Sequence, residues 1–348
     1  MQVAILGAGA IAYANSAVLC RDGHDVILWS PSGQRTATLA AGAPLIATGA
    51  VVGQFHPRIA ASCAAALADA EAVVVAVPGY GHRRVLDTAA PHLRSGQTVV
   101  FSSHMSLAAL YLAGLLRERG VTAPIAALGT TVVTGRQTAP DAVTVGTIRT
   151  RLDVAVLPES AAARGIAVCR ALFGDRFVPR SGLLAIALSN VNAQNHLAIA
   201  LCNLTRMELG ETWGQNRHIT PAVARLIEAL DAERLAIAKA FGLTVRTIHE
   251  HFHLSFGVPM GPLAEMAQAL AQPGGTGPAT LDTRYVTEDV PFGLVPTIRL
   301  ATLAGVPVPL HESGLRLISA LYGRDFETEN DILPQLGTLS REMLTGLG

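Results

Sequence analysis

The sequence predicts an α/β domain with a doubly wound parallel sheet, followed by an all-α second domain. Three observations carry this prediction. A glycine-rich turn follows the first apolar run, short β-rich runs alternate with helical stretches up to about residue 180, and β-rich runs nearly vanish beyond it. Alternating strands and helices build parallel sheets that are covered on both faces. We therefore expect one domain over residues 1–180 and a helical domain over residues 181–348.

The first strand and the turn behind it indicate a dinucleotide site. Residues 2–6 form a short apolar run, and Gly7-Ala8-Gly9-Ala10-Ile11-Ala12 follows directly. Gly7 permits a tight turn, Gly9 leaves room for phosphates, and Ala12 is small enough for close helix packing. A G-x-G-x-x-A turn of this kind aims backbone N–H groups at a pyrophosphate, as in Rossmann-type domains. We expect NAD or NADP to be bound by Gly7, Gly9, Ala10, Ile11 and Ala12; the alternative is a glycine-rich turn that binds nothing.

The remaining elements of the first domain follow from apolar runs bounded by turn residues. The first helix is expected to end near Gly23, because glycine is favoured just beyond a helix C-terminus. Strands are expected at residues 25–29, 71–78, 97–101, 142–148 and 152–157. Ligands of such a sheet bind at the carboxyl ends of its strands.

The end of the second strand bears on the choice of cofactor. NAD-preferring sites usually place an acid there, bonded to the ribose 2′-OH. Here Ser30, Ser32 and Arg35 follow the strand, and Asp25 stands at its other end. Hydroxyl groups and a guanidinium suit a 2′-phosphate, which a carboxylate would repel. We therefore expect NADP to be favoured over NAD, with these three residues as binders; the alternative is that Arg35 is an ordinary solvated residue.

Composition excludes several classes of partner. Half of the 348 residues are hydrophobic, 15% are charged and the net charge is zero. Zero net charge argues against nucleic acid and against an anionic membrane surface. The longest uncharged stretches contain polar residues and predict buried helices rather than membrane spans. We expect small-molecule substrates as partners, and the apolar second domain is compatible with a homodimer.

Cysteine usage and the start of the chain predict the compartment. Cys20, Cys63, Cys169 and Cys202 lie far apart and form no C-x-x-C pair. This spacing suits buried thiols in a reducing compartment. Because a strand already begins at residue 2, we expect no signal peptide. The predicted location is the cytoplasm.

Helix signals dominate the second domain. Thr220 and Pro221 suit an N-cap and the first helical position, and this helix is expected to reach Phe241 before Gly242. Residues 272–278 are rich in proline and glycine and predict a flexible loop.

A polar stripe marks the apolar helix expected over residues 189–209. At about 100° per residue, Asn192, His196, Ile199 and Asn203 fall within about 40° of one another. A helix this apolar would not bury Asn and His on one stripe unless they had partners or a function. Histidine exchanges a proton near neutral pH, which the reduction of a carbonyl or imine by hydride requires. The alternative is a core histidine bonded to a backbone carbonyl.

A second polar patch precedes another apolar helix. Arg284, Tyr285, Glu288 and Asp289 stand within six residues, at the start of a run that extends to Pro296. A carboxylate there could orient an imidazole, and an arginine could hold a substrate carboxylate through two parallel bonds. The alternative is a solvated loop whose acids serve the dipole of the following helix.

On these residues the chain resembles the octopine/nopaline family of opine dehydrogenases. The matching motifs are Asn192-x-x-x-His196, Asp231-x-Glu233-Arg234, Val77-Pro78-Gly79-Tyr80-Gly81-His82, and the long run Arg284-Tyr285-x-x-Glu288-Asp289-Val290-Pro291-Phe292-Gly293-Leu294-Val295-Pro296. The resemblance covers nearly the whole chain. It implies that His196 is the proton donor, Asp289 its orienting partner and Arg284 the clamp on a substrate carboxylate. Further expected contacts are Asn192, Asn203 and Tyr285 for the substrate, and Val77 and Pro78 for the cofactor.

The resemblance implies reduction of the C=N bond formed between a 2-oxo acid and an amino group, with an N-carboxyalkyl amino acid as product. Three segments depart from the family pattern. Ser30 stands where members often carry an acid, residues 102–104 (Ser-Ser-His) where a Pro-Gly pair is usual, and residues 127–129 (Ala-Leu-Gly) where Glu is frequent. The first departure bears on the cofactor, and the other two bear on the substrate.

Two other functions stay open from the sequence. Simple reduction of a 2-oxo acid or ketone, as in ketopantoate reductases, would use a helix lysine, whereas the only lysine, Lys239, lies outside the polar stripe. A nucleotide-binding sensor without turnover would need no proton relay.

Two histidine features remain. His249-Glu250-x-x-His253 fits the H-E-x-x-H pattern of zinc enzymes but lacks a clear third ligand, so we predict no metal site. His104 follows a strand of the nucleotide domain and could face the nicotinamide; the alternative is a loop histidine.

Overall fold

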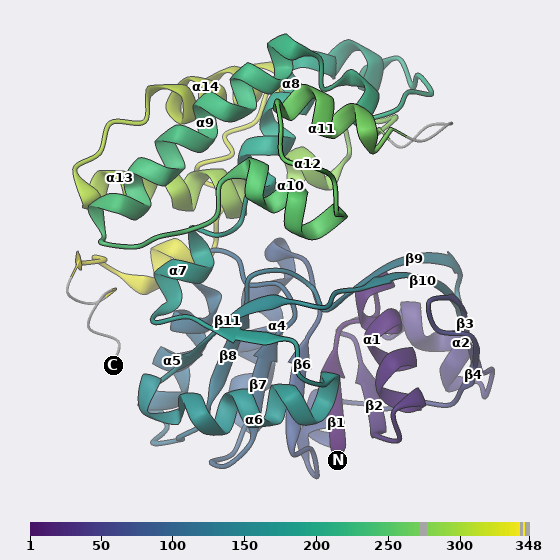
Figure 1. Ribbon diagram of the computed structural model, residues 1–348. Helices are drawn as coiled ribbons and strands as arrows, with labels where there is room; N and C mark the ends of the chain where they lie inside the picture. The colour runs from purple at the N-terminus through teal and green to yellow at the C-terminus, as the bar shows by residue number, and fades with distance from the viewer. Residues whose placement is uncertain (272–276, 342–343, 345–348) are drawn as a thin grey trace. The chain divides into compact units, whose positions relative to one another are not determined.

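The chain divides into two compact units in the computed structural model, which describes residues 1–271, 277–341 and 344 (Figure 1). Unit 1 comprises Met1–Ile186 together with Leu344, and unit 2 begins at Ala187. The division therefore falls a few residues beyond the boundary expected at residue 180.

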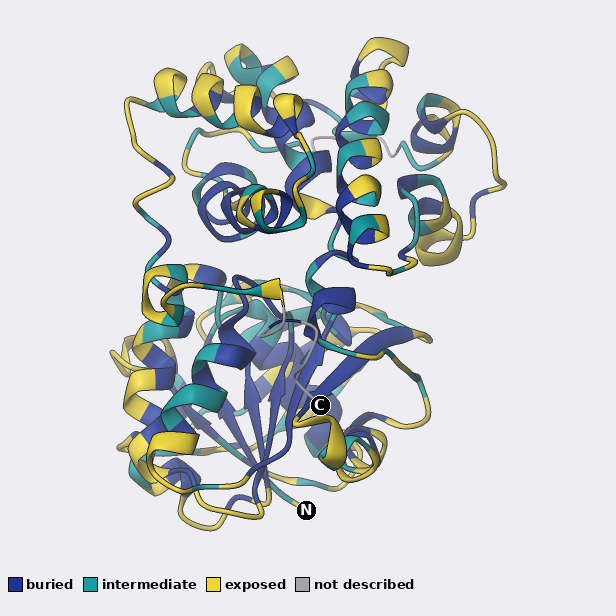
Figure 2. Ribbon diagram, turned by 90° about the vertical axis from the view of Figure 1, so that its left-hand side faces the viewer, coloured by how far each residue is buried: buried dark blue, intermediate teal, exposed yellow. Residues whose placement is uncertain are grey.

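Unit 1 is built on an eight-stranded sheet in the order β12-β11-β8-β7-β6-β1-β2-β5. Neighbouring strands are parallel except for β8 and β11, which run antiparallel. Figure 2 shows these strands largely buried, as expected for apolar runs that are covered on both faces. The bounds are β1 (Gln2–Leu6), β2 (Asp25–Trp29), β5 (Arg58–Ile59), β6 (Ala72–Val75), β7 (Thr98–Phe101), β8 (Ile125–Leu128), β11 (Leu152–Leu157) and β12 (Phe177–Pro179).

The order of strands confirms the predicted Rossmann-type, doubly wound topology. β1 pairs with β2 on one side and with β6 on the other, so the chain changes direction across the sheet at β1. Such a switch point opens a ligand crevice at the carboxyl ends of the strands. The first helix ends as predicted, because Gly23 follows it with φ of 82°. The helices of unit 1 are α1 (Ala10–Arg21), α2 (Ala37–Ala40), α3 (Cys63–Leu67), α4 (His82–Ala89), α5 (Ala108–Glu118), α6 (Ala162–Phe173) and α7 (Leu183–Ala187), the last of which crosses the division by one residue.

A second, four-stranded sheet in the order β4-β3-β10-β9 distinguishes unit 1 from a simple doubly wound domain. Its strands are β3 (Leu45–Gly49), β4 (Gly53–Phe55), β9 (Val133–Ala139) and β10 (Ala142–Ile148). The strand expected at residues 142–148 therefore exists but pairs outside the main sheet. β9 lies close against α1: a Cβ at Gly135 would be 2.8 Å from both the Ala10 carbonyl oxygen and the Ala14 Cβ.

Unit 2 is helical, and no strand occurs among its described residues. Apolar side chains from most of its helices meet in one core. The helix predicted from Thr220 begins as expected, since the Thr220 hydroxyl accepts a hydrogen bond from the N–H of Val223. The loop predicted at residues 272–278 falls mostly outside the described residues. The helices are α8 (Asn192–Glu208), α9 (Pro221–Ala240), α10 (Ile248–Phe256), α11 (Leu263–Ala269), α12 (Arg284–Thr287), the short π-helix η6 (Val290–Leu294), α13 (Val295–Ala304) and α14 (Pro309–Tyr322).

Length and polarity of the helices bear on a membrane location. Among the residues that the structure describes, no helix is both long enough and apolar enough to cross a membrane.

Two buried histidines flank Phe101 at the end of β7. His82 and His104 are 1% and 3% exposed, and their ring centroids lie 5.5 and 6.0 Å from that of Phe101. Neither ring nitrogen of either histidine has a hydrogen-bond partner among the described residues. Burial lowers the pKa of His82 to about 4, and burial together with the charge of His82 lowers that of His104 to about 3. Both rings are therefore neutral in the folded protein at neutral pH.

Because of these histidines, we expect the folded protein to lose stability in acid. An unfolded chain binds their protons below about pH 6.5, whereas the folded chain binds them only near pH 4 and pH 3. Because the unfolded state then holds more protons, the free energy of unfolding falls as the pH falls through this window, by about 2 kcal/mol per histidine between pH 7 and pH 5. Urea unfolding at several pH values measures this loss. His104→Leu should remove about half of it, and an unchanged pH dependence in this variant would contradict the assignment.

Candidate active site

The glycine-rich turn after β1 is held between its two neighbouring strands. The Gly7 N–H donates to the Trp29 carbonyl at 2.8 Å, and the Ala76 N–H donates to the Leu6 carbonyl at 2.9 Å. Gly7 has φ of 136°, and a Cβ there would lie 2.3 Å from the Ala76 carbonyl oxygen. Only glycine fits this position. Val77 and Pro78, both partly buried, follow β6 beside this turn.

The start of α1 leaves backbone N–H groups available to an anion. Gly9 is the N-cap, and no side chain of the described residues caps the first turn of the helix. Among the same residues, the atom nearest to a Cβ placed on Gly9 would be Nη1 of Arg35, at 3.8 Å. Ala10 and Ile11 are partly exposed in the first turn, while Ala12 is fully buried against the core. Uncapped N–H groups at a helix N-terminus suit a pyrophosphate, so these residues fit a dinucleotide.

The residues after β2 fit the adenosine half of such a cofactor. The buried Ser30 hydroxyl has no hydrogen-bond partner among the described residues. Ser32 and Arg35 are exposed, and the Arg35 carbonyl is held by the Tyr13 hydroxyl at 2.5 Å. The turn after β2 is thereby fixed to α1, with the Arg35 guanidinium close to Gly9. An orphan hydroxyl and a nearby cation are suitable partners for ribose and phosphate oxygens.

In unit 2, a hydrogen bond joins two side chains that stand 93 positions apart in the sequence. His196 Nδ1 on α8 lies 2.7 Å from Oδ2 of Asp289, which directly precedes η6. The side chains are 15% and 10% exposed. This distance is that of a charge-assisted hydrogen bond, which fixes both the ring and the position of one ring proton.

Tyr285 covers the face of the same imidazole. The two rings are stacked with their centroids 3.7 Å apart and their planes 6° from parallel. The Tyr285 hydroxyl donates to the Gln215 side chain. Burial, and then the charge of Asp289, raise the pKa of Tyr285 to about 12, so the phenol stays protonated. Tyr285 and Asp289 together hold His196 in one orientation.

Arg284 pairs with an acid from its own patch. Its Nε donates to Glu288, four residues on. The Glu288 side chain is 2% exposed, whereas that of Arg284 is 65% exposed. A buried carboxylate therefore anchors an arginine whose side chain is mostly exposed.

The remaining stripe residues do not join His196. Asn192 is exposed in the first turn of α8. Asn203 is buried, and its side-chain N–H donates to the Ile199 carbonyl of its own helix at 3.0 Å. The backbone of α8 departs from helical geometry at Asn203, with φ of −130°. A helix that breaks at this point satisfies its asparagine internally, which the sequence period could not show.

The H-E-x-x-H histidines have other partners. His249 Nε2 lies 3.1 Å from Oε1 of Glu228, and His253 Nδ1 lies 2.7 Å from the Val258 carbonyl oxygen. Over residues 1–271 and 277–341 there is no group of three or more His, Cys, Asp or Glu side chains placed to hold a metal. His104 lies in the loop that follows β7, where it is buried at 3% exposure.

Two contacts of the site were not expected from the sequence. Gln215, which bonds Tyr285, lies in a loop whose place cannot be read from a local pattern. The pairing of Arg284 with Glu288 follows from their i,i+4 spacing, which is a signal that the sequence does contain.

Comparisons with known protein families match the two parts of the chain to different family models. Residues 179–322 match the family described as NAD/NADP octopine/nopaline dehydrogenase, alpha-helical domain, and residues 3–103 match ketopantoate reductase PanE/ApbA. The opine dehydrogenase of Arthrobacter sp. (strain 1C) is 34% identical over 341 residues, or 96% of this chain and 94% of that protein. The vitopine synthase of Allorhizobium ampelinum is 26% identical over 330 residues, or 90% of this chain and 89% of that protein.

Solved structures share the fold. A structure of octopine dehydrogenase with NADH and L-arginine superposes with a TM-score of 0.82 at 18% identity, over 99% of this chain and 98% of that one. A structure of yersinopine dehydrogenase with NADP+ superposes with a TM-score of 0.71 at 18% identity, over 100% of this chain and 97% of that one. The sequence relationship to the Arthrobacter protein spans both units. The chain therefore belongs to the opine dehydrogenase family, whose members are NAD- or NADP-dependent oxidoreductases.

Proposed function

We propose that this protein reduces the imine formed between a 2-oxo acid and an amino acid. The observation that carries the proposal is the hydrogen bond between His196 and Asp289, beneath the ring of Tyr285. Octopine dehydrogenase has been solved with L-arginine and with pyruvate, which supports these two substrate classes here. Bound NADH or NADPH would supply the hydride.

His196 handles the proton of the reaction. Converting C=N to CH–NH adds a hydride to carbon and a proton to nitrogen. Asp289 accepts a hydrogen bond from Nδ1, so Nε2 is the nitrogen that exchanges its proton with the substrate. The carboxylate keeps the ring in one tautomer and compensates its charge when both nitrogens are protonated. Tyr285 prevents the ring from turning about its side-chain bonds.

Arg284 binds a substrate carboxylate. Its Nε donates to the buried Glu288, and its side chain is 65% exposed. An arginine held in this way can form two parallel hydrogen bonds with a carboxylate. Asn192, exposed one turn before His196, is a further candidate contact.

The amine requirement tests the reaction itself. We expect NADPH or NADH absorbance to fall when a 2-oxo acid and an amino acid are both present, and to stay constant with either alone. Pyruvate, oxaloacetate and 2-oxoglutarate, each with a panel of amino acids, cover the substrate classes. Turnover with the oxo acid alone would indicate simple reduction, and tight cofactor binding without any turnover would indicate a sensor.

Two variants separate proton exchange from substrate binding. His196→Ala should lower kcat by about a hundredfold or more, because the proton donor is lost. Arg284→Lys should raise the KM for the oxo acid by roughly tenfold or more, because a lysine cannot form the paired bonds. Steady-state kinetics measures both, with cofactor binding followed by fluorescence as the control. A near-normal kcat in His196→Ala would remove this residue from the mechanism.

We propose further that NADP is the preferred cofactor. Three features support this: no acid stands at the end of β2, the Ser30 hydroxyl has no hydrogen-bond partner in the part of the chain that the structure describes, and the Arg35 guanidinium lies near the glycine-rich turn. A 2′-phosphate would gain a cation and a hydroxyl there without meeting a carboxylate.

Cofactor preference can be tested at Arg35. Arg35→Ala should raise the KM for NADPH by about tenfold and change the KM for NADH much less, because only NADPH carries the extra phosphate. Arg84→Ala, which removes an exposed arginine of α4, serves as the matched control. A strong preference for NADH in the unaltered enzyme would overturn this assignment.

We also propose a homodimer in the cytoplasm. The four cysteines are free, which suits a reducing compartment. Leu310, Leu317 and Leu321 of α14 are between 37% and 56% exposed and supply apolar surface for a second subunit. A mass from light scattering equal to one chain would exclude the dimer.

A further inference from the structure

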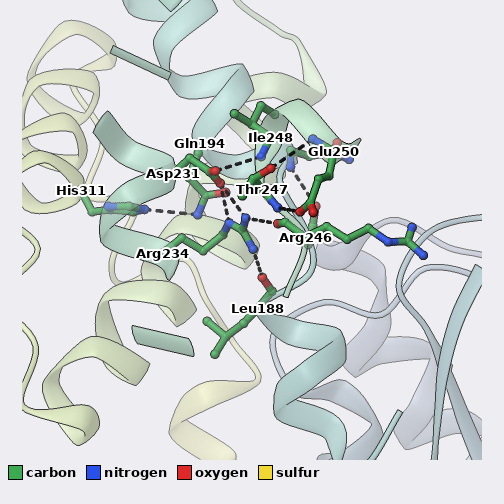
Figure 3. A network of polar contacts seen from close by, with 11 residues as sticks. Leu188, Gln194, Asp231, Arg234, Arg246, Thr247, Ile248, Glu250 and His311 are labelled. Carbon is green, nitrogen blue, oxygen red and sulfur yellow. Dashed lines mark hydrogen bonds and ion pairs between the residues drawn. The ribbon is translucent and has the colours of Figure 1, made fainter. Parts of the chain in front are cut away.

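Gln194 and His196 lie on opposite sides of α8. Residues of a helix follow one another at about 100°, so two positions separate their side chains by about 200°. His196 meets Asp289 on one side. On the other side the Gln194 Nε2 lies 3.2 Å from Nε2 of His311 on α14, and Gln194 is only 1% exposed (Figure 3). Side chains therefore hold α8 from two directions within one turn of the proposed proton donor.

His311 is itself fixed by Glu233 of α9. Its Nδ1 lies 2.6 Å from Oε2 of Glu233, and the backbone N–H groups of Leu310 and His311 donate to the same carboxylate at 2.9 and 3.1 Å. Burial acts to raise the pKa of Glu233, but the hydrogen bonds from His311 and Leu310 lower it below its ordinary value. The ionised carboxylate keeps the ring proton on Nδ1, so Nε2 of His311 accepts from the Gln194 amide.

The helix that carries Glu233 is anchored by its neighbour Arg234. This guanidinium is fully buried and donates to Asp231 at 2.6 and 2.9 Å, to the Arg246 carbonyl at 2.6 Å and to the Leu188 carbonyl (Figure 3). A buried charge with all its partners in place permits few other arrangements of the segments that it joins. Leu188 lies four residues before α8. Through Arg234, α9 therefore fixes the segment that leads into α8, and through Glu233 and His311 it also holds one side of α8.

Close packing couples α14 directly to α8. A Cβ on Gly314 would lie 2.6 Å from Cδ2 of Leu197, so the two helices approach as closely as a glycine allows. Gly314 is one turn beyond His311, and Leu197 directly follows His196. A shift of α14 at His311 is therefore transmitted to the helix that carries His196.

We propose that Gln194 and His311 are positioning residues, which set the rotation of α8 and thereby the alignment of His196 with Asp289. The inference rests on the proposed role of His196 in catalysis. The His196 ring is roughly 6 Å from the helix axis, so a 10° rotation of α8 moves it by about 1 Å. A shift of that size breaks a 2.7 Å hydrogen bond and is enough to cost about a hundredfold in rate.

Gln194→Met tests the proposal, since it keeps the length of the side chain and removes the bond to His311. We expect kcat to fall tenfold or more while the KM for the cofactor, which binds unit 1, stays unchanged. The downfield proton NMR signal of His196 Nδ1–H, bonded to Asp289, should shift or disappear. In an Asp289→Asn background, where this alignment is already lost, Gln194→Met should cause little further loss.

Gln97→Met is the matched control. It makes the same substitution at another buried glutamine, whose Nε2 donates to the Leu67 and Ala70 carbonyls of unit 1 at 2.8 Å. We expect it to lower Tm but to leave kcat and the NMR signal unchanged. If Gln194→Met behaves like this control, the bond has a structural role only and the proposal fails.

A second variant and a readout that does not require turnover complete the experiment. If Gln194→Met does not fold, His311→Asn takes its place, because its amide can still reach Glu233 but not Gln194. The NMR signal does not depend on turnover, so it tests the alignment even if imine reduction is absent. Loss of the proposed function would show in the unaltered enzyme, whereas failure of this inference would show as an unshifted signal in both variants.

Discussion

The hydrogen bond between His196 and Asp289 is the interaction on which the proposed chemistry of unit 2 depends. It joins two elements far apart in the sequence, and both partners are mostly buried in a strongly apolar helical core. Burying a carboxylate costs free energy unless the carboxylate is paired, and a buried imidazole cannot stay charged without an acidic partner. Each partner therefore lowers the free-energy cost of burying the other, and Tyr285 covers one face of the ring.

Much of the fold could be predicted from local patterns. The bounds of β1 and β2, the glycine-rich turn and the start of α9 all depend on neighbouring residues, and the structure has them as expected. The partners of a strand depend on the whole chain instead. The run at residues 142–148 reads as a strand of the main sheet, yet it pairs with β3 and β9 in a second sheet, and β11 runs antiparallel to β8. The local pattern of apolar residues in these strands does not show which neighbour each strand pairs with.

The candidate site shows the same limit. Helical periodicity grouped Asn203 with His196, but the break of α8 at Asn203 and its bond to Ile199 satisfy that side chain inside the helix. Helical periodicity also did not single out Gln194, because its side chain points away from the polar stripe. Its importance arises from His311 of α14, more than a hundred residues later, which bonds its amide and is itself held by Glu233 of α9. Contacts of this kind come from the tertiary fold and leave no local signal.

The two halves of the proposed machinery are encoded in separate stretches of the chain. Every residue assigned to the dinucleotide lies in unit 1, whereas the imidazole, its acid and the carboxylate clamp all lie in unit 2. On these assignments, substitutions that alter the reductant and substitutions that alter proton exchange or carboxylate binding fall in different stretches of the sequence. Selection on one property then acts on the loop after β2, and selection on the other acts on the helical half.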